Sequence, residues 1–170
     1  FEIKKGNFFL IFGESGSGKT TILNLLMGLV KPNKGEILVD NDNINKNILS
    51  WRKMVSYVPQ SIYLLDQNIK QNIAFGVEES EIDYIKLKDS MKLAKIENLA
   101  LENSFENFDL GEKGSKISGG QIQRIGVARA LYRNPNVILM DECTNGLDYD
   151  IEKRFLEDLI KIKKNTTIIF

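Results

Sequence analysis

Apolar and polar positions follow two different rhythms along this chain. Apolar runs at 8–12 and within 136–142 are typical of strands buried on both faces of a parallel sheet. Over 19–29, apolar residues recur instead at helical spacing. These patterns predict strands at 8–12, 35–40, 54–58, 136–142 and 166–170, and helices at 19–29, 68–75, 80–103, 119–133 and 150–163. Strands that alternate with helices predict an α/β fold.

The middle of the chain departs from this alternation. No strand is predicted between 61 and 134, so we expect this stretch to form a helical subdomain inserted between strands of the sheet. Residues 1–60 and 135–170 would then form the sheet-containing core. With 170 residues in all, the chain is long enough for one domain with a real hydrophobic core.

The composition is that of a soluble globular domain, with 42% hydrophobic and 27% charged residues. The 23 basic and 23 acidic residues balance, which argues against a nonspecific nucleic-acid binder. Cys143 is the single cysteine, so no internal disulfide can form, and this fits a reducing compartment. No apolar run is long enough to span a bilayer, and we recognise no signal peptide. Both chain ends fall inside strand-like patterns, so we expect a longer protein that supplies any membrane connection.

The stretch 13–20 matches the phosphate-loop pattern G-x-x-x-x-G-K-[ST], between a predicted strand and a predicted helix. Its glycines allow backbone N–H groups to approach an anion closely. Lys19 would reach the β- and γ-phosphates, and the Thr20 hydroxyl would bind Mg²⁺. The alternative is a glycine-rich turn before a helix, a chance match on the order of one in a hundred at this length. The predicted nucleotide-binding residues here are Gly13, Glu14, Ser15, Gly16, Ser17, Gly18, Lys19, Thr20 and Thr21.

An acidic pair follows the second buried strand, where that strand emerges into solvent. Phosphate-loop enzymes hold Mg²⁺ with a carboxylate at this place, a role that suits Asp141. Side chains alternate along a strand, so Glu142 points differently and could polarise an attacking water. The alternative is an ordinary acidic strand end. The phosphate loop in the same chain favours the catalytic interpretation.

A second glycine-rich stretch, "ISGGQ" at 117–121, opens the predicted helix 119–133. Its exposed N–H groups could form another anion site. This stretch resembles the signature of ABC (ATP-binding cassette) proteins. Together, the phosphate loop, the acidic pair and this stretch resemble the nucleotide-binding domain of that family. The resemblance implies that Ser118, Gly119, Gly120 and Gln121 face the γ-phosphate bound by a second cassette. The alternative is a capped helix with a flexible entry.

Four further stretches resemble the same family. Gln60 in "YVPQ" resembles the glutamine that contacts Mg²⁺, and Asp148 in "TNGLD" resembles the aspartate that crosses the dimer interface. "LGEKG" at 110–114 and "NIAFG" at 72–76 resemble exporter-type cassettes, in which Glu112 would contact the membrane domain. The resemblance covers essentially the whole chain. It implies a phosphate-loop NTPase fold with a mainly parallel sheet in a RecA-like core, a small antiparallel part and an inserted helical subdomain.

The function implied by the resemblance is ATP hydrolysis with Mg²⁺ at a dimer interface. Two cassettes, identical or different, would bind two nucleotides head to tail and power export or flipping of a substrate. The transmembrane domain, on the same chain, would place the cassette at the cytoplasmic face of the membrane, with no nucleic-acid partner. The alternative is a soluble ABC ATPase of DNA maintenance or of the ribosome. The neutral net charge argues against nucleic-acid contact. The lack of sustained heptads argues against the DNA-maintenance type with its coiled coils, and the single cassette argues against the ribosome type.

The sequence also departs from the family pattern. Ile117 stands where the signature usually has leucine, and Cys143 follows Glu142 where a small residue is common. We interpret Cys143 as a packing residue rather than a redox sensor. The chain contains no histidine, so we expect the family's switch histidine just beyond 170 and the adenine-stacking aromatic before residue 1. Whether residues 1–170 hydrolyse ATP by themselves is therefore left open.

Overall fold

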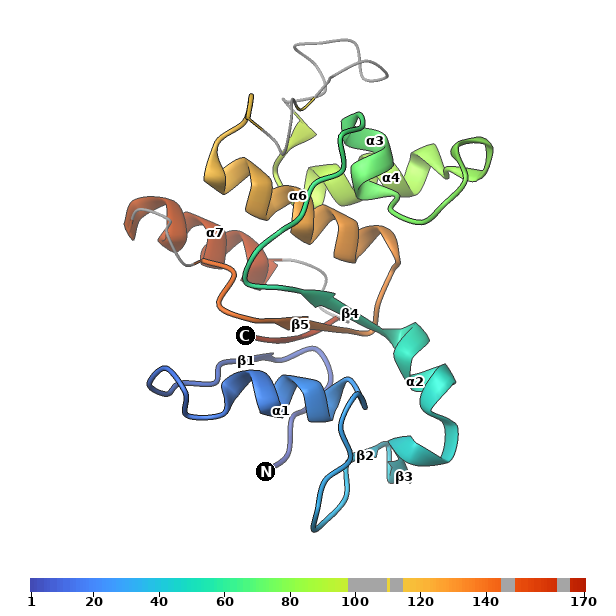
Figure 1. Cartoon of the computed structure of the whole chain (residues 1–170), viewed down its shortest axis with the longest axis vertical. Helices are drawn as coiled ribbons and strands as arrows, with labels where there is room; N and C mark the ends of the chain where they lie inside the picture. The colour runs from blue at the N-terminus through green and yellow to red at the C-terminus, as the bar shows by residue number, and fades with distance from the viewer. Residues whose placement is uncertain (98–109, 111–114, 145–148, 162–165) are drawn as a thin grey trace.

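The chain folds around a four-stranded parallel sheet (Figure 1). The computed structural model describes residues 1–97, 110, 115–144, 149–161 and 166–170. The strands lie in the order β1-β6-β5-β4, and each pairs with its neighbour in parallel. They are β1 (Phe8–Phe9), β4 (Val55–Val58), β5 (Val137–Met140) and β6 (Thr167–Ile169). The parallel sheet predicted from the apolar runs is confirmed.

Helices cover both faces of this sheet. In Figure 1, α1 (Lys19–Leu26) lies on one face, and α6 (Gly119–Tyr132) and α7 (Tyr149–Lys161) lie on the other. Side chains alternate along each strand, so β5 serves both layers. Leu139 packs with Leu23 of α1, whereas its neighbours Ile138 and Met140 join the core beneath α6 and α7. Burial on both faces explains why β5 reads as an unbroken apolar run.

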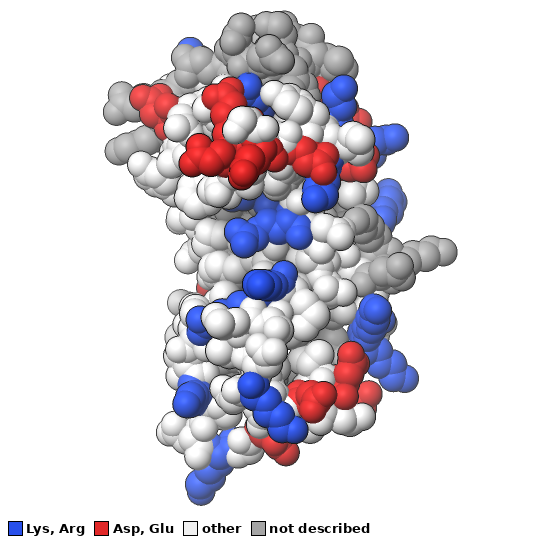
Figure 2. All heavy atoms as spheres, turned by 90° about the vertical axis from the view of Figure 1, so that its right-hand side faces the viewer, with Lys and Arg blue, Asp and Glu red and all other residues white. Residues whose placement is uncertain are grey.

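A helical block lies beyond α6, on the side away from the sheet (Figure 1). It contains α3 (Ile69–Ile73), a 3₁₀ turn (Glu79–Glu81) and α4 (Tyr84–Leu93). The helix predicted over 80–103 is therefore wrong in its extent, because Asp83 caps the start of α4 and Lys95 takes a left-handed conformation after its end. Figure 2 shows acidic side chains over this block and a band of Lys and Arg below them.

A small antiparallel hairpin follows α1, made of β2 (Leu38–Val39) and β3 (Asp42–Asn43). Asp40 and Asn41 both have positive φ, as a two-residue hairpin turn requires. A 3₁₀ turn (Ile44–Asn47) then leads into α2 (Ile48–Met54), which the sequence patterns did not predict. The buried Trp51 anchors α2, because its indole N–H donates to Leu26 O at 2.6 Å. Within the described ranges, no helix is long and apolar enough to cross a bilayer.

Candidate active site

The phosphate loop connects β1 to α1 at the carboxyl end of the sheet. Pairing of β1 with β6 continues to Ile11, whose N–H donates to Phe170 O at 2.7 Å, and the loop begins directly afterwards. Gly16 and Gly18 have φ of 81° and 97°, values that residues with a Cβ rarely adopt. Gly18 is also the N-cap of α1, so the first N–H groups of the helix remain available to an anion.

Lys19 is held in place against the loop that precedes it. Its ammonium group donates to Gly13 O at 2.9 Å and to Glu14 O at 3.0 Å. It also forms an ion pair with Glu142 Oε1 at 3.0 Å, with 17% of the lysine side chain exposed. The loop, the first residue of α1 and the end of β5 therefore meet at one ammonium group.

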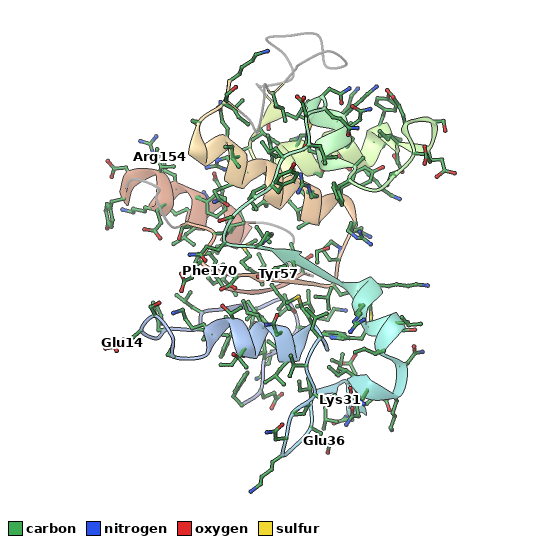
Figure 3. The ribbon with its side chains drawn as sticks, viewed as in Figure 1. Glu14, Lys31, Glu36, Tyr57, Arg154 and Phe170 are labelled. Carbon is green, nitrogen blue, oxygen red and sulfur yellow. The ribbon has the colours of Figure 1, made fainter. Side chains whose placement is uncertain are left out.

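Asp141 lies directly after β5 and is buried. Its Oδ2 accepts hydrogen bonds from Thr20 Oγ1 at 2.9 Å and from the Tyr57 hydroxyl at 3.2 Å. Burial, and then the charge of Asp141, raise the pKa of Tyr57 to about 12, so the hydroxyl keeps its proton and donates it. Figure 3 shows Tyr57 near the centre of the molecule and Glu14 at the tip of the loop before α1.

Glu142 faces different partners from its neighbour. Its Oε1 meets Lys19, and its Oε2 accepts a hydrogen bond from Gln60 Nε2 at 3.3 Å. The backbone of Glu142 has φ 45°, which is uncommon for a residue with a Cβ and is often found at functional sites. The chain thus turns sharply after Asp141, and the two adjacent carboxylates contact different side chains.

A cavity of about 300 Å³ lies over this cluster. Gly13, Lys19, Asp141 and Glu142 line its polar side, and Phe12, Leu10 and Phe170 belong to its apolar side. The lysine, the loop and the two carboxylates on its polar side fit a polyphosphate with a cation.

The donor set at Thr20 and Asp141 fits Mg²⁺. A hydroxyl and a carboxylate, 2.9 Å apart, are the hard oxygen ligands that this ion takes together with substrate phosphates and water. In the ranges that the structure describes, no three His, Cys, Asp or Glu residues form a metal cluster. The protein would therefore contribute few ligands, as is usual for Mg²⁺ in phosphate-transfer sites.

The signature stretch lies apart from this cavity. Ser118 caps α6 through a reciprocal pair of hydrogen bonds: Gln121 N donates to Ser118 Oγ at 3.3 Å, and Ser118 N donates to Gln121 Oε1 at 2.7 Å. Ser118 and Gly119 are exposed. Figure 1 draws the N-termini of α1 and α6 on opposite faces of the sheet. One copy of the chain therefore does not bring the two glycine-rich stretches together.

The remaining predicted residues have separate outcomes. Asp148 and Glu112 lie outside the described residues. Cys143 is fully buried in the main core cluster, and burial raises the pKa of its thiol to about 12, consistent with a packing role. Tyr57 was missed by sequence reasoning. The alternation of β4 places residue 57 only on the face of the sheet that packs against α1, and it does not show that the hydroxyl reaches Asp141.

Comparisons with known proteins agree on one family. The model of the family described as ABC transporter matches residues 1–145. An export ATP-binding/permease protein of Rickettsia conorii is 38% identical over 170 residues, which are 99% of this chain and 29% of the relative. ABC transporter B family member 13 of Arabidopsis thaliana is 39% identical over 173 residues, 99% of this chain and 14% of the relative.

A solved structure gives the same result. The structure of a bacterial Atm1-family ABC exporter with ATP bound matches with a TM-score of 0.83 and 32% identity, over 99% of this chain and 30% of that chain. The mainly parallel sheet and the small antiparallel sheet thus have a counterpart in an ABC exporter. The chain spans less than a third of the length of each of these relatives.

Proposed function

The chain belongs to the ABC transporter family of ATP hydrolases, and from this premise we propose that it binds and hydrolyses Mg²⁺-ATP between two cassettes. The observation that carries the proposal is that Lys19, Asp141 and Glu142 line one cavity. Thr20 and Gln60 are hydrogen-bonded to its two carboxylates, Asp141 and Glu142. These side chains come from three separate parts of the sequence. The sheet brings them to one edge, because the carboxyl ends of its parallel strands lie together.

Residues Gly13 to Thr20 hold the phosphates in this proposal. Backbone N–H groups of the loop and of the first turn of α1 donate to phosphate oxygens, and Thr21 lies in that turn. Lys19 contributes the positive charge opposite the β- and γ-phosphates. The Thr20 hydroxyl, the Asp141 carboxylate and the Gln60 amide would hold a magnesium ion, which would neutralise the phosphate charge.

Glu142 acts on the attacking water. Its carboxylate lies beside the phosphate lysine and near Gln60, close to where the terminal phosphate would lie. From that place it can orient the water and accept its proton. Most of the rate enhancement would come from the fixed positive groups of the loop in a site from which water is excluded.

The second half of each site comes from another cassette. Ser118, Gly119 and Gly120 expose the N-terminus of α6, and Gln121 fixes Ser118 through the capping box. A head-to-tail dimer would place this terminus against the γ-phosphate on the partner's loop. Asp148 is proposed to lie at the same interface. Hydrolysis then removes the group that both halves hold, so the dimer loosens.

The work of this cycle is proposed to be export. The Rickettsia conorii relative is named as an export ATP-binding/permease protein and the solved structure as an ABC exporter, which supports a transmembrane domain as partner. Glu112 is proposed to contact that domain, which would hold the cassette at the cytoplasmic face of the membrane.

Replacing the catalytic carboxylate tests the proposed function. Glu142→Gln keeps the shape of the side chain but removes the proton acceptor, so hydrolysis by the full-length protein should fall about 100-fold or more. ATP affinity should change little, and the dimer should accumulate with ATP. Lys19→Ala should instead weaken ATP binding itself, because a charge-assisted contact is lost. Phosphate release and nucleotide-binding titrations separate these effects. Hydrolysis at the normal rate by Glu142→Gln would refute the assigned role.

A further inference from the structure

The segment 59–64 carries Gln60 from the end of β4 towards α3. Gln60 Nε2 lies 3.3 Å from Glu142 Oε2, so the path of this segment decides where the amide meets the carboxylate. Two carbonyls of the segment, those of Gln60 and Tyr63, accept hydrogen bonds from side chains. Both donors belong to α6, the helix that begins at the signature. The segment thus leaves the sheet and attaches to α6.

The two donors are Gln123 and Arg129. Gln123 Nε2 donates to Gln60 O at 3.5 Å, and Arg129 Nη1 donates to Tyr63 O at 3.0 Å. Arg129 cannot swing away freely, since its Nε also donates to Asn72 O at 2.8 Å and its guanidinium lies 5.1 Å from the centre of the Phe75 ring. Burial lowers the pKa of Arg129, as expected for a cation enclosed by protein.

Gly126 lies between these donors on α6. Because it has no side chain, Ile62 of the segment can pack close to the helix. A Cβ at this position would lie 2.5 Å from Ile62 Cδ1 and 2.9 Å from Ile62 Cγ1. Any larger residue would therefore force the side chain of Ile62 to move. Glycine is less favourable than alanine in a helix interior, so this buried glycine is explained by the close approach and not by helix stability. Gln123, Gly126 and Arg129 form what we call the α6 seat.

We propose that the α6 seat is a positioning device for catalysis: it fixes segment 59–64 to α6, so that the orientation of this helix sets the distance between Gln60 and Glu142. The inference rests on the proposed function. A second cassette that docks on Ser118 contacts the same rigid helix, and Gln123 follows about 8 Å along its axis. Docking at the signature is thus transmitted to Gln60 by the three residues of the α6 seat. The three residues act through Gln60 and touch no reacting atom.

The seat is tested by filling the space at Gly126. Gly126→Ala in the full-length protein should displace Ile62 and segment 59–64. We expect kcat to fall about tenfold or more, because small misplacements near a reacting group are costly. KM for ATP should stay within about twofold, because the phosphate loop is untouched. Hydrogen exchange of the amides of 60–66, measured by mass spectrometry without nucleotide, should become faster.

A compensating variant distinguishes displacement from damage to the helix. Gly126→Ala combined with Ile62→Ala restores the space, so kcat and hydrogen exchange should return towards those of the Ile62→Ala single variant. If the double variant stays as impaired as Gly126→Ala, the effect belongs to the helix and the inference fails. It also fails if Gly126→Ala keeps the kcat and exchange of the unchanged protein.

Gln123→Met tests the seat by a route that does not depend on Gly126. Within the described residues, the buried Oε1 of Gln123 accepts no hydrogen bond, so methionine should leave the melting temperature unchanged or raise it. A lower kcat with undiminished stability supports the seat, and an unchanged kcat contradicts it. If the unchanged protein hydrolyses no ATP, the proposed function fails, whereas the exchange measurements still decide whether the seat exists.

Discussion

Two adjacent carboxylates have different environments in this site. Asp141 is buried between the hydroxyls of Thr20 and Tyr57, whereas Glu142 faces a lysine and an amide. Strand alternation predicted that the pair would diverge. It could not reveal the left-handed backbone at Glu142, which belongs to the turn after β5. It also could not reveal the tyrosine hydroxyl on Asp141, because that contact depends on how β4 and β5 lie side by side.

Tyr57→Phe measures what this hydroxyl contributes. The change removes one of two donors to Asp141 Oδ2 and leaves the ring in the apolar layer against α1. Because a hydrogen bond to a charged group is lost, we expect the free energy of unfolding to fall by about 1–2 kcal/mol. A less firmly held carboxylate should also raise the Mg²⁺ concentration for half-maximal hydrolysis about threefold. Urea titration and Mg²⁺ titration measure the two effects. No change in either would show that Thr20 holds Asp141 unaided.

At the scale of elements, the buried strands were predictable because continuous apolar runs reflect burial on both faces. The elements that were missed or misjudged depend on single polar residues and on pairing. Asn47 caps α2 and Asp83 caps α4, and each cap sets a boundary that apolar periodicity does not contain. The short hairpin of β2 and β3 depends on two residues with positive φ, which are visible only once the strands are paired.

Ser118 gives a prediction at the same scale, because it caps α6 and is also proposed to bind a phosphate. Ser118→Asp keeps a good N-cap, so the melting temperature should change little. The added negative charge would face the partner's γ-phosphate, so ATP-dependent dimerisation and hydrolysis should be lost. Ser118→Thr is the matched control, since it keeps a hydroxyl cap without a charge. Thermal melting and light scattering with ATP distinguish the two roles. Normal dimerisation of Ser118→Asp would contradict a phosphate at this helix.

At the scale of the whole molecule, the described residues of one chain hold a phosphate loop and a signature that do not meet. The loop precedes α1 on one face of the sheet, and the signature opens α6 on the other (Figure 1). The sequence contained both motifs and their order. The family resemblance implied that the signature serves a second cassette. The residues alone could not show that folding keeps the two motifs apart, because that follows from which face each helix covers. A head-to-tail pair gives each loop the signature of the other chain.

Complementation between two inactive variants tests this geometry directly. Lys19→Ala disables the loop, and Ser118→Asp disables the signature, so each homodimer should be inactive. In a mixed dimer, one site combines both lesions, and the other combines an intact loop with an intact signature. Random exchange makes half of the dimers mixed, so activity should recover to about a quarter of normal if the sites act independently. A site built within one chain contains a lesion in every molecule and predicts no recovery. Hydrolysis measured before and after subunit exchange therefore distinguishes a shared site from one that a single cassette completes.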